Sequence, residues 1–183
     1  IEDRPMSHPS GQPGPCVVIK PDGKEQWVKL NPIQDWLSAS PDELIGQIQN
    51  CGLAGLGGAV FPTHAKMRDG RDRNTHTLIL NGVECEPYIS CDEMLMRERP
   101  GKIILGGRIL RRVLGAERLV IAIEGQMEAV KKALTGSSEF ADSKNIAIVK
   151  VPTIYPEGGE RQLIQGLTGL EVPAGGRPSD LGL

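Results

Sequence analysis

Short apolar runs alternate with amphipathic segments along most of the chain. Continuous apolar runs at 77–80, 119–123 and 146–151 are typical of strands that are buried on both faces. Such strands, separated by helices, predict a mostly parallel sheet with helices on both faces, because parallel neighbours need long crossovers. We therefore expect an α/β, Rossmann-like domain, with helices over 92–114 (divided at Pro100 and Gly101), 126–134 and 159–167.

One further helix is predicted before the first strand. Residues 40–43 carry a start signal, in which a capping serine is followed by proline and two acids, and Gly52 marks the end. A polar stretch over 68–75 then reads as an irregular link to the first strand. The apolar face of this helix consists of Leu44, Ile45, Ile48 and Cys51.

The first 38 residues follow another pattern. Apolar stretches at 16–19 and 27–30 flank Pro21-Asp22-Gly23, which is typical of a turn between two strands. A hairpin is too short to be a stable sheet by itself. We therefore expect residues 1–38 to be the remnant of a small β domain with its linker, and 39–183 to be the α/β domain.

Charge and hydropathy exclude some functions. The formal net charge of −2, with both signs mixed along the 183 residues, gives no electrostatic footprint for nucleic acid. No apolar run approaches the ~20 residues that cross a bilayer. The chain begins at Ile1 and ends in a stretch rich in glycine and proline, so we expect it to be a piece of a longer protein.

The four cysteines, Cys16, Cys51, Cys85 and Cys91, form no Cys-x-x-Cys pair and have no histidine at ligand spacing. We therefore predict no metal site in this chain. Cysteines of this kind are usually buried, reduced thiols, which suits a reducing compartment such as the cytosol.

Candidate chemistry centres on a glycine loop over 52–66. Four glycines within 52–58 leave a backbone that can bring consecutive N–H groups to a phosphate, and Lys66 adds a positive charge. The loop lacks the last glycine of the dinucleotide-binding turn and the Gly-Lys-Ser/Thr of a phosphate loop. A flexible surface loop is therefore the alternative interpretation.

Polar groups also follow each predicted strand. Asn81, Glu84 and Glu86 follow the first, Glu124 the second, and the segment 155–160 the third. Ligands of open parallel sheets bind beyond the carboxyl ends of the strands, so the topology favours one pocket lined by these groups and the glycine loop.

Each of these side chains also has a plainer interpretation. Glu84 and Glu86 either orient a cofactor through charge-assisted hydrogen bonds or are solvated acids at a helix N-terminus, and Glu160 has the same two interpretations. Tyr155 and Phe61 either stack on a planar ring or fill the core.

Three motifs together resemble a known family. Residues 55–66 (GLGGAVFPTHAK), 81–88 (NGVECEPY) with 91–96, and 151–164 (VPTIYPEGGERQLI) with 168–176 are similar to the RnfC subunit of the Rnf (Rsx) electron-transport complex. RnfC in turn resembles the subunit of respiratory complex I that binds FMN and NADH. The resemblance implies that residues 1–38 belong to a β unit of the barrel-sandwich kind.

The resemblance also implies a set of cofactor-binding residues and no catalytic side chain, because the flavin carries the chemistry. The FMN phosphate is expected on the glycine loop, the flavin ring beside the groups after the strands, and NADH next to it. The expected contacts are Gly55, Gly57, Gly58, Ala59 and Lys66 for the phosphate, Asn81, Glu84, Tyr155, Gly159 and Glu160 for the flavin, and Glu86 and Phe61 for NADH.

The activity implied is hydride transfer between NADH and FMN, then single-electron steps to two 4Fe-4S clusters in the parent protein. Electrons would continue to the membrane and ferredoxin-like subunits of the Rnf complex, coupled to ion movement, at the cytoplasmic face of the bacterial inner membrane.

Two alternatives stay open. One is a flavoprotein reductase of the corrinoid-reductase kind, built on the same domain. The other is an assembly module that has lost cofactor affinity. Val60 bears on the second, because it replaces a glycine usual in the family, and a β-branched residue resists positive φ.

Overall fold

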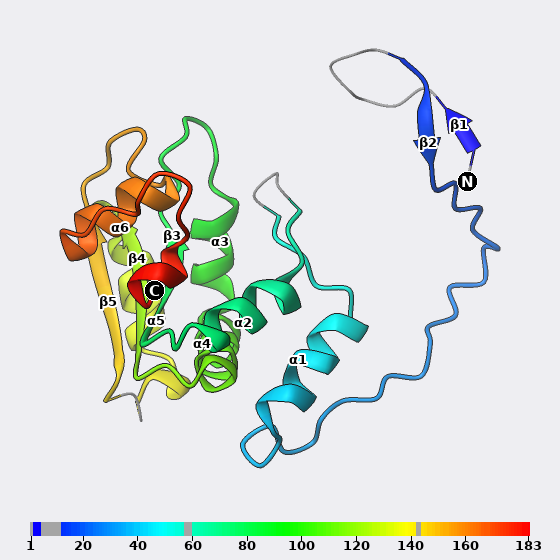
Figure 1. The fold of residues 1–183 in the computed structure, drawn as a ribbon, viewed down its shortest axis with the longest axis horizontal. Helices are drawn as coiled ribbons and strands as arrows, with labels where there is room; N and C mark the ends of the chain where they lie inside the picture. The colour runs from blue at the N-terminus through cyan, green and yellow to red at the C-terminus, as the bar shows by residue number, and fades with distance from the viewer. Residues whose placement is uncertain (1, 5–11, 57–59, 142–143) are drawn as a thin grey trace. The chain divides into compact units, whose positions relative to one another are not determined.

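The computed structural model describes residues 2–4, 12–56, 60–141 and 144–183. The chain divides into two compact units, residues 1–34 and 35–183, and each is described here by itself. The second unit contains all the helices found in the described residues and the larger of the two sheets (Figure 1).

The first unit contains a small antiparallel pair rather than the predicted hairpin. Strand β1 (Glu2–Arg4) pairs with β2 (Gly14–Cys16), while the described residues from 17 to 30 form no strand. The hairpin prediction over 16–19 and 27–30 is therefore wrong. Val17, Ile19 and Trp27 are between 78% and 87% exposed, so no apolar surface of this unit stabilises those residues as strands.

The second unit has a parallel sheet in the order β3-β4-β5. Thr77 pairs with Arg118 and Leu119 pairs with Ile146, so the strands lie in close register and end at one edge. These strands and the helices between them confirm the predicted α/β alternation. The elements are α1 (Pro41–Asn50), α2 (Thr63–Asp72), β3 (Thr77–Gly82), α3 (Cys91–Glu98), α4 (Pro100–Leu114), β4 (Arg118–Glu124), α5 (Glu128–Thr135), a 3-10 turn (Ser138–Phe140), β5 (Ile146–Val151), α6 (Glu160–Thr168) and a second 3-10 turn (Pro178–Leu181).

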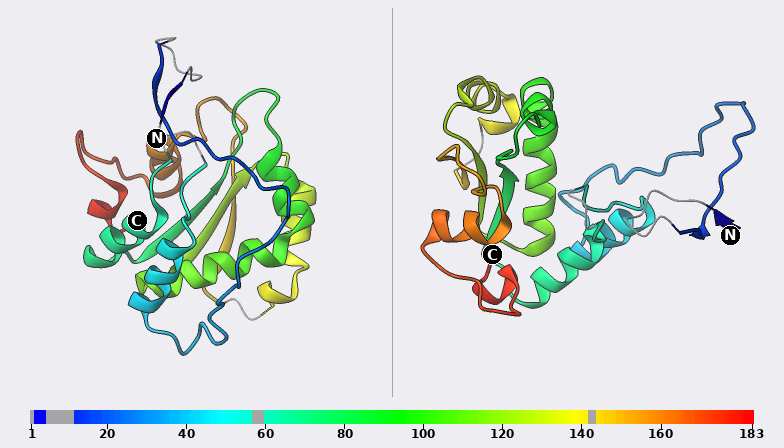
Figure 2. Two further views of the ribbon diagram at one scale, coloured as in Figure 1. Left: turned by 90° about the vertical axis from the view of Figure 1, so that its right-hand side faces the viewer. Right: turned by 90° about the horizontal axis from the view of Figure 1, so that it is seen from above.

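Helices cover both faces of this sheet, as predicted. On one face, Leu163 of α6 packs in a core cluster with Val83, Ala122 and Val151. On the other, α4 approaches closely at Gly107, where an added Cβ would lie 2.7 Å from the Leu119 side chain. In the right-hand view of Figure 2, α6 (orange) and α4 (green) accordingly lie on opposite sides of the strands.

The first helix begins where the sequence predicts. The Ser40 hydroxyl accepts a hydrogen bond from the Glu43 amide at 3.2 Å, and Leu44, Ile45 and Ile48 are buried. Cys51 is exposed, contrary to prediction, because it follows the last helical residue and closes the helix through its backbone amide.

The predicted link over 68–75 is wrong, because α2 extends through most of it. This helix buries only Met67 and Gly70, so its sequence is dominated by polar residues on an exposed surface. A helix with so narrow an apolar face gives little periodic signal.

The described cysteines form no disulfide bond. The prediction that all four are buried is wrong, since Cys51 and Cys91 are exposed and Cys16 and Cys85 are partly buried. Each exposed cysteine lies at a helix end, where apolar packing is incomplete. Among the described residues, the helices are too short or too polar to span a membrane.

Candidate functional site

The glycine loop is closed at its base by backbone contacts. The Gly55 amide donates to the Phe61 carbonyl at 2.9 Å, the Thr63 amide donates to the Leu53 carbonyl at 3.0 Å, and residues 54 and 62 form a bridge. The Gly55 N–H is thus engaged within the loop. The predicted phosphate contacts Gly57, Gly58 and Ala59 lie outside the described residues.

Val60 lies beside these positions in a left-handed conformation. Its φ is +50°, a region that favours glycine and that a β-branched residue enters at a cost of about 1–2 kcal/mol. Its side chain is 65% exposed, and that of Phe61 is 56% exposed. The structure therefore gives this valine a glycine-type conformation and presents Phe61 to solvent, where a ring could stack on it.

Lys66 lies in the first half of α2 and pairs with Glu160 at the start of α6. Their Nζ and Oε1 atoms are 3.4 Å apart, and both side chains are more than half exposed. An exposed pair of this kind contributes little stability, about 0–1 kcal/mol. Two predicted site residues separated by 94 positions in sequence are thus brought together.

Asn81 connects the loop after β3 to the loop before α6. Its Nδ2 donates to the Gly158 carbonyl at 2.8 Å, and its Oδ1 accepts from the Val83 amide at 3.1 Å. An amide side chain has a second N–H and a second lone pair, so it retains hydrogen-bonding capacity for a ligand. The next residue, Gly159, precedes α6 and accepts from the Leu163 amide at 2.8 Å.

Glu84 caps α3 across a loop. Its carboxylate accepts the backbone amides of Asp92 at 2.8 Å and Glu93 at 2.9 Å, where the helix dipole favours a negative charge. The Cys91 thiol donates to the same carboxylate at 3.3 Å. The helix-terminus interpretation of Glu84 thus describes its contacts within the protein, while direct contact with a flavin stays a prediction.

The charge of Glu84 affects its neighbours. The hydrogen bond to Glu84, followed by burial, raises the pKa of the Cys91 thiol. Burial, followed by the Glu84 charge, raises the pKa of the Asp92 carboxyl. These three residues bring ligand-type atoms within 4.8 Å of one another, but the α3 dipole that favours the Glu84 anion disfavours a cation there.

The remaining predicted contacts are exposed at the same edge of the sheet. Tyr155 is 71% exposed, and Glu86 is also exposed, in the segment between β3 and α3. Neither has a described partner that would hold it away from a ligand, apart from a 3.9 Å contact of Glu86 with the Cys85 thiol. A planar ligand at this edge would meet both side chains on loops rather than on the rigid sheet.

Glu124 is the one buried carboxyl side chain among the described residues, at 1% exposure. Its Oε2 accepts from the Gln126 side chain, while its Oε1 has no hydrogen-bond partner in the described part of the chain. Lys150 instead donates to the Gly125 carbonyl at 3.0 Å and pairs with Glu128. The second predicted strand therefore ends in a carboxyl group that lies inside the protein.

A cavity of about 490 Å³ lies at the other end of the strands. It is formed where α4, the first 3-10 turn and the start of β5 meet, so it faces away from the carboxyl ends of the strands. Its lining combines cationic and apolar side chains: Arg108, Arg111, Phe140, Ala141, Lys144, Asn145 and Ile146.

The glycine loop and the carboxyl edge of the sheet define a class of protein. Residues 48–183 match the family model described as the Nuo51 FMN-binding domain. Because the match covers most of the chain, the chain belongs to this family.

Curated relatives narrow the comparison. The chain is 48% identical over 181 residues to the RnfC-type (C) component of the ion-translocating oxidoreductase complex of Haemophilus influenzae strain 86-028NP, covering 97% of this chain and 26% of that protein. The component of the same name from Pseudomonas aeruginosa is 46% identical over 183 residues, covering 100% of this chain and 23% of the relative. These similarities confirm the predicted resemblance. The chain spans about a quarter of the length of these relatives.

Solved structures agree with the fold. The chain is similar to a chain of the NAD+-reducing [NiFe]-hydrogenase in its air-oxidised state, with a TM-score of 0.62 and 27% identity over 71% of this chain and 24% of that one. The H2-reduced state gives a TM-score of 0.59.

Proposed function

We propose that this chain binds FMN at the carboxyl edge of its sheet, with the phosphate held by the glycine loop and Lys66. Membership of the FMN-binding family supports the cofactor. The observation that carries the site is the Lys66–Glu160 pair, which joins the helix after the glycine loop to the loop after β5. A phosphate can replace Glu160 as the partner of Lys66 at small cost, because the pair is exposed.

The residues present fit an FMN molecule. Gly57, Gly58 and Ala59 would supply phosphate-binding amides, and Phe61 and Tyr155 are exposed for stacking on planar rings. Asn81 and Glu84 keep unused hydrogen-bonding capacity beyond their contacts within the protein. Gly159 lets the chain pass close to the ring, and Glu86 would contact NADH.

When bound, FMN supplies the step from two-electron to one-electron chemistry. The chain's own groups bind and orient the flavin and nicotinamide, and no side chain is assigned a catalytic role. We further propose that NADH is the partner reactant and that electrons leave to two 4Fe-4S clusters held elsewhere in the parent protein. The complex would be an Rnf-type assembly with membrane and ferredoxin-like subunits, with this chain on the cytoplasmic face.

An FMN titration tests the proposal. Quenching of FMN fluorescence by the chain gives its affinity, and Lys66→Ala is expected to weaken binding by about tenfold or more, the loss of one charge-assisted contact. Lys132→Ala, which removes an exposed lysine from α5, is the matched control and is expected to leave the affinity unchanged. Equal affinities of the two variants, or no binding by the chain and its full-length parent, would reject the proposed site.

One observation favours an assembly module as a second candidate. Val60 occupies a left-handed conformation in the loop that would hold the phosphate, so a glycine-specific position has lost its glycine. Under this alternative, the full-length protein purifies without flavin absorbance and joins its partner subunits in the absence of FMN. The corrinoid-reductase alternative differs in its electron acceptor, and reduction of a corrinoid by NADH would identify it.

A further inference from the structure

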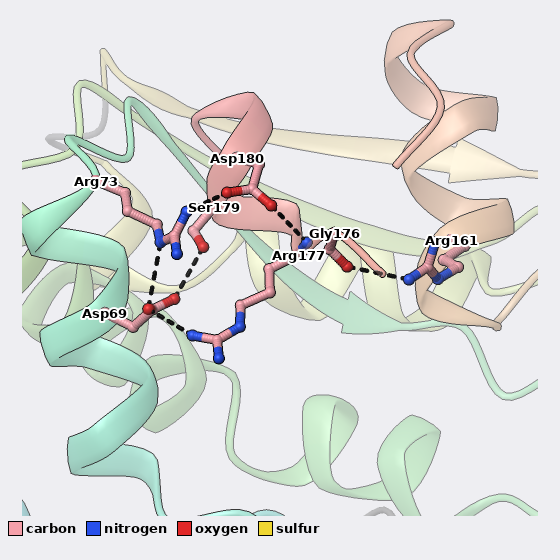
Figure 3. A network of polar contacts seen from close by, with 7 residues as sticks. All are labelled: Asp69, Arg73, Arg161, Gly176, Arg177, Ser179 and Asp180. Atoms are coloured by element: carbon pink, nitrogen blue, oxygen red, sulfur yellow. Dashed lines mark hydrogen bonds and ion pairs between the residues drawn. The ribbon is translucent and has the colours of Figure 1, made fainter. Parts of the chain in front are cut away.

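A polar network connects the two helices that carry Lys66 and Glu160. It is built around residues 172–180, the segment that follows α6, which we call the buckle. Figure 3 shows the network, with Asp69 and Arg73 on α2, Arg161 on α6, and Gly176, Arg177, Ser179 and Asp180 in the buckle.

On the α6 side, Arg161 holds the buckle through backbone carbonyls. Its Nη1 donates to the carbonyls of Val172 at 2.9 Å and Pro173 at 3.1 Å, and its Nη2 donates to that of Gly176 at 3.1 Å. A guanidinium presents several donors in one fixed plane, whereas a lysine ammonium does not match this spread of acceptors. Arg161 follows Glu160 directly, so the buckle is attached at the first turn of α6.

On the α2 side, Asp69 holds the other end. Its Oδ1 accepts from Arg177 Nη1 at 2.7 Å and Arg73 Nε at 3.3 Å, and its Oδ2 accepts from the buried Ser179 hydroxyl at 2.9 Å. Arg73 also pairs with Asp180. Asp69 lies three residues after Lys66, which places the two side chains on neighbouring turns of one helix.

The buckle is itself closed and anchored. The Arg177 amide donates to Asp180 Oδ2 at 2.8 Å, and the Gly182 carbonyl beyond it accepts the amides of His76 at 2.9 Å and Thr77 at 3.2 Å. The chain after α6 is thus fixed along the outer strand β3 as well as to α2. Its position relative to both helices is therefore well defined.

Little else joins α2 to α6. In the part of the chain that the structure describes, Lys66–Glu160 is the direct polar contact between these two helices, and it is exposed and weak. Most of the packing of α2 is against α1 and α4. The buckle thus supplies the more extensive connection, through three hydrogen bonds from Arg161 and three to Asp69.

We propose that Asp69 and Arg161 are positioning residues that hold α2 and α6 at the separation at which Lys66 and the first turn of α6 together bind the FMN phosphate and ring. This inference rests on the proposed FMN site. Neither residue contacts the cofactor, because both act through the buckle on the helices that do.

A double-mutant cycle tests the coupling. Asp69→Asn removes the charge that binds Arg177 and Arg73, and is expected to weaken FMN binding by at least about threefold in a chain that remains folded. In the Lys66→Ala background, the same change is expected to have no further effect, because its action passes through Lys66. Losses that multiply independently, or an unchanged affinity, would overturn the inference. A purely structural role lowers the unfolding temperature without this dependence on Lys66.

Matched variants define the control. Asp72→Asn makes the same substitution on the same helix, at an exposed residue with no described ion pair, and is expected to leave the affinity unchanged. Arg161→Lys keeps the charge but loses the spread of donors, so it is expected to behave like Asp69→Asn. If Arg161→Lys binds FMN as tightly as the unchanged chain, the assignment of Arg161 is wrong.

A distance measurement separates this inference from the FMN proposal. Spin labels at Arg68→Cys on α2 and Gln162→Cys on α6, in a chain whose own cysteines are replaced by serine, are expected to give one narrow distance distribution. Asp69→Asn is expected to broaden it. A broadened distribution in a chain that does not bind FMN would support the buckle and reject the site. An unchanged distribution would reject the buckle whether or not FMN binds.

Discussion

The side-chain amide of Asn81 donates to the carbonyl of Gly158 at 2.8 Å and so joins two loops that are 77 residues apart. The same side chain accepts the Val83 amide. One asparagine therefore fixes the loop after β3 against the loop before α6, with its donor and its acceptor both in use.

Asn81→Asp tests this contact. The substitution keeps the shape but places a carboxylate oxygen against the Gly158 carbonyl, so we expect a loss of about 1–3 kcal/mol in the free energy of unfolding. Chemical denaturation measures the change. Asn50→Asp, at the exposed end of α1, is the matched control, with an expected change within about 0.5 kcal/mol. Equal effects of the two variants would contradict the structural role of Asn81.

The conformation of Val60 gives a prediction with the opposite sign. Val60→Gly removes the cost of a left-handed β-branched residue, partly offset by greater freedom of the unfolded chain, so we expect stabilisation by about 0.5–1 kcal/mol. Ala54→Gly, at the base of the same loop and without a positive φ, is expected to destabilise. Destabilisation by Val60→Gly would mean that the valine side chain contributes more than its strain. Thermal unfolding of both variants decides.

The sequence predicted the sheet and most helices because each buries a broad apolar face. Ile121 and Ile123 are fully buried in β4, so their strand stands out as a continuous apolar run. Helix α2 escaped prediction because its buried face is narrow. The N-terminal hairpin was predicted from local turn residues alone, although strands such as 16–19 form only where another surface covers them.

The site was predicted in part for similar reasons. Topology brought Lys66 and Glu160 to one edge, as the rule for parallel sheets requires. The Glu84 cap on α3 was open in the sequence, because this acid lies seven residues before the helix and local capping patterns span three. The contacts of Asp69 with Arg177 and Ser179 join residues more than 100 positions apart, so no local pattern shows them.

Asp69 gives a pH prediction. Burial opposes ionisation of this carboxyl, but the hydrogen bond from Ser179 and the charges of Arg73 and Arg177 outweigh it and lower its pKa. A lowered pKa in the folded state contributes stability above the unfolded value of about 3.9, and that contribution is lost as the pH falls through the folded value. We expect the stability difference between the unchanged chain and Asp69→Asn to be constant near pH 7 and to shrink below about pH 4. Denaturation at several pH values measures it, and a difference that stays constant down to pH 3 would contradict this linkage.

Cys91 gives a reactivity prediction. Its thiol is exposed, yet the hydrogen bond to Glu84 raises its pKa and keeps it protonated. Because the thiolate is the nucleophile, Glu84→Gln is expected to speed alkylation of Cys91 by iodoacetamide at pH 8. Cys51, exposed at the end of α1, is the internal reference, and its rate is expected to stay constant. Mass spectrometry of the labelled peptides gives both rates, and an equal acceleration of both would indicate loosening of the fold instead.

Gly158 packs so closely on the loop after β3 that a side chain cannot be added. A Cβ there would lie 2.4 Å from the Val83 carbonyl oxygen and 2.9 Å from the Cys85 sulfur, and the carbonyl is backbone that cannot turn away. Gly158→Ala is therefore expected to cost about 1–3 kcal/mol of unfolding free energy and to weaken the Asn81 contact. Gly46→Ala in α1 is the matched control, because nothing lies within 4 Å of its added Cβ, and it is expected to stabilise by about 0.5–1 kcal/mol. If Gly158→Ala is as stable as Gly46→Ala, the two loops are not in the close contact on which the arrangement of the site depends.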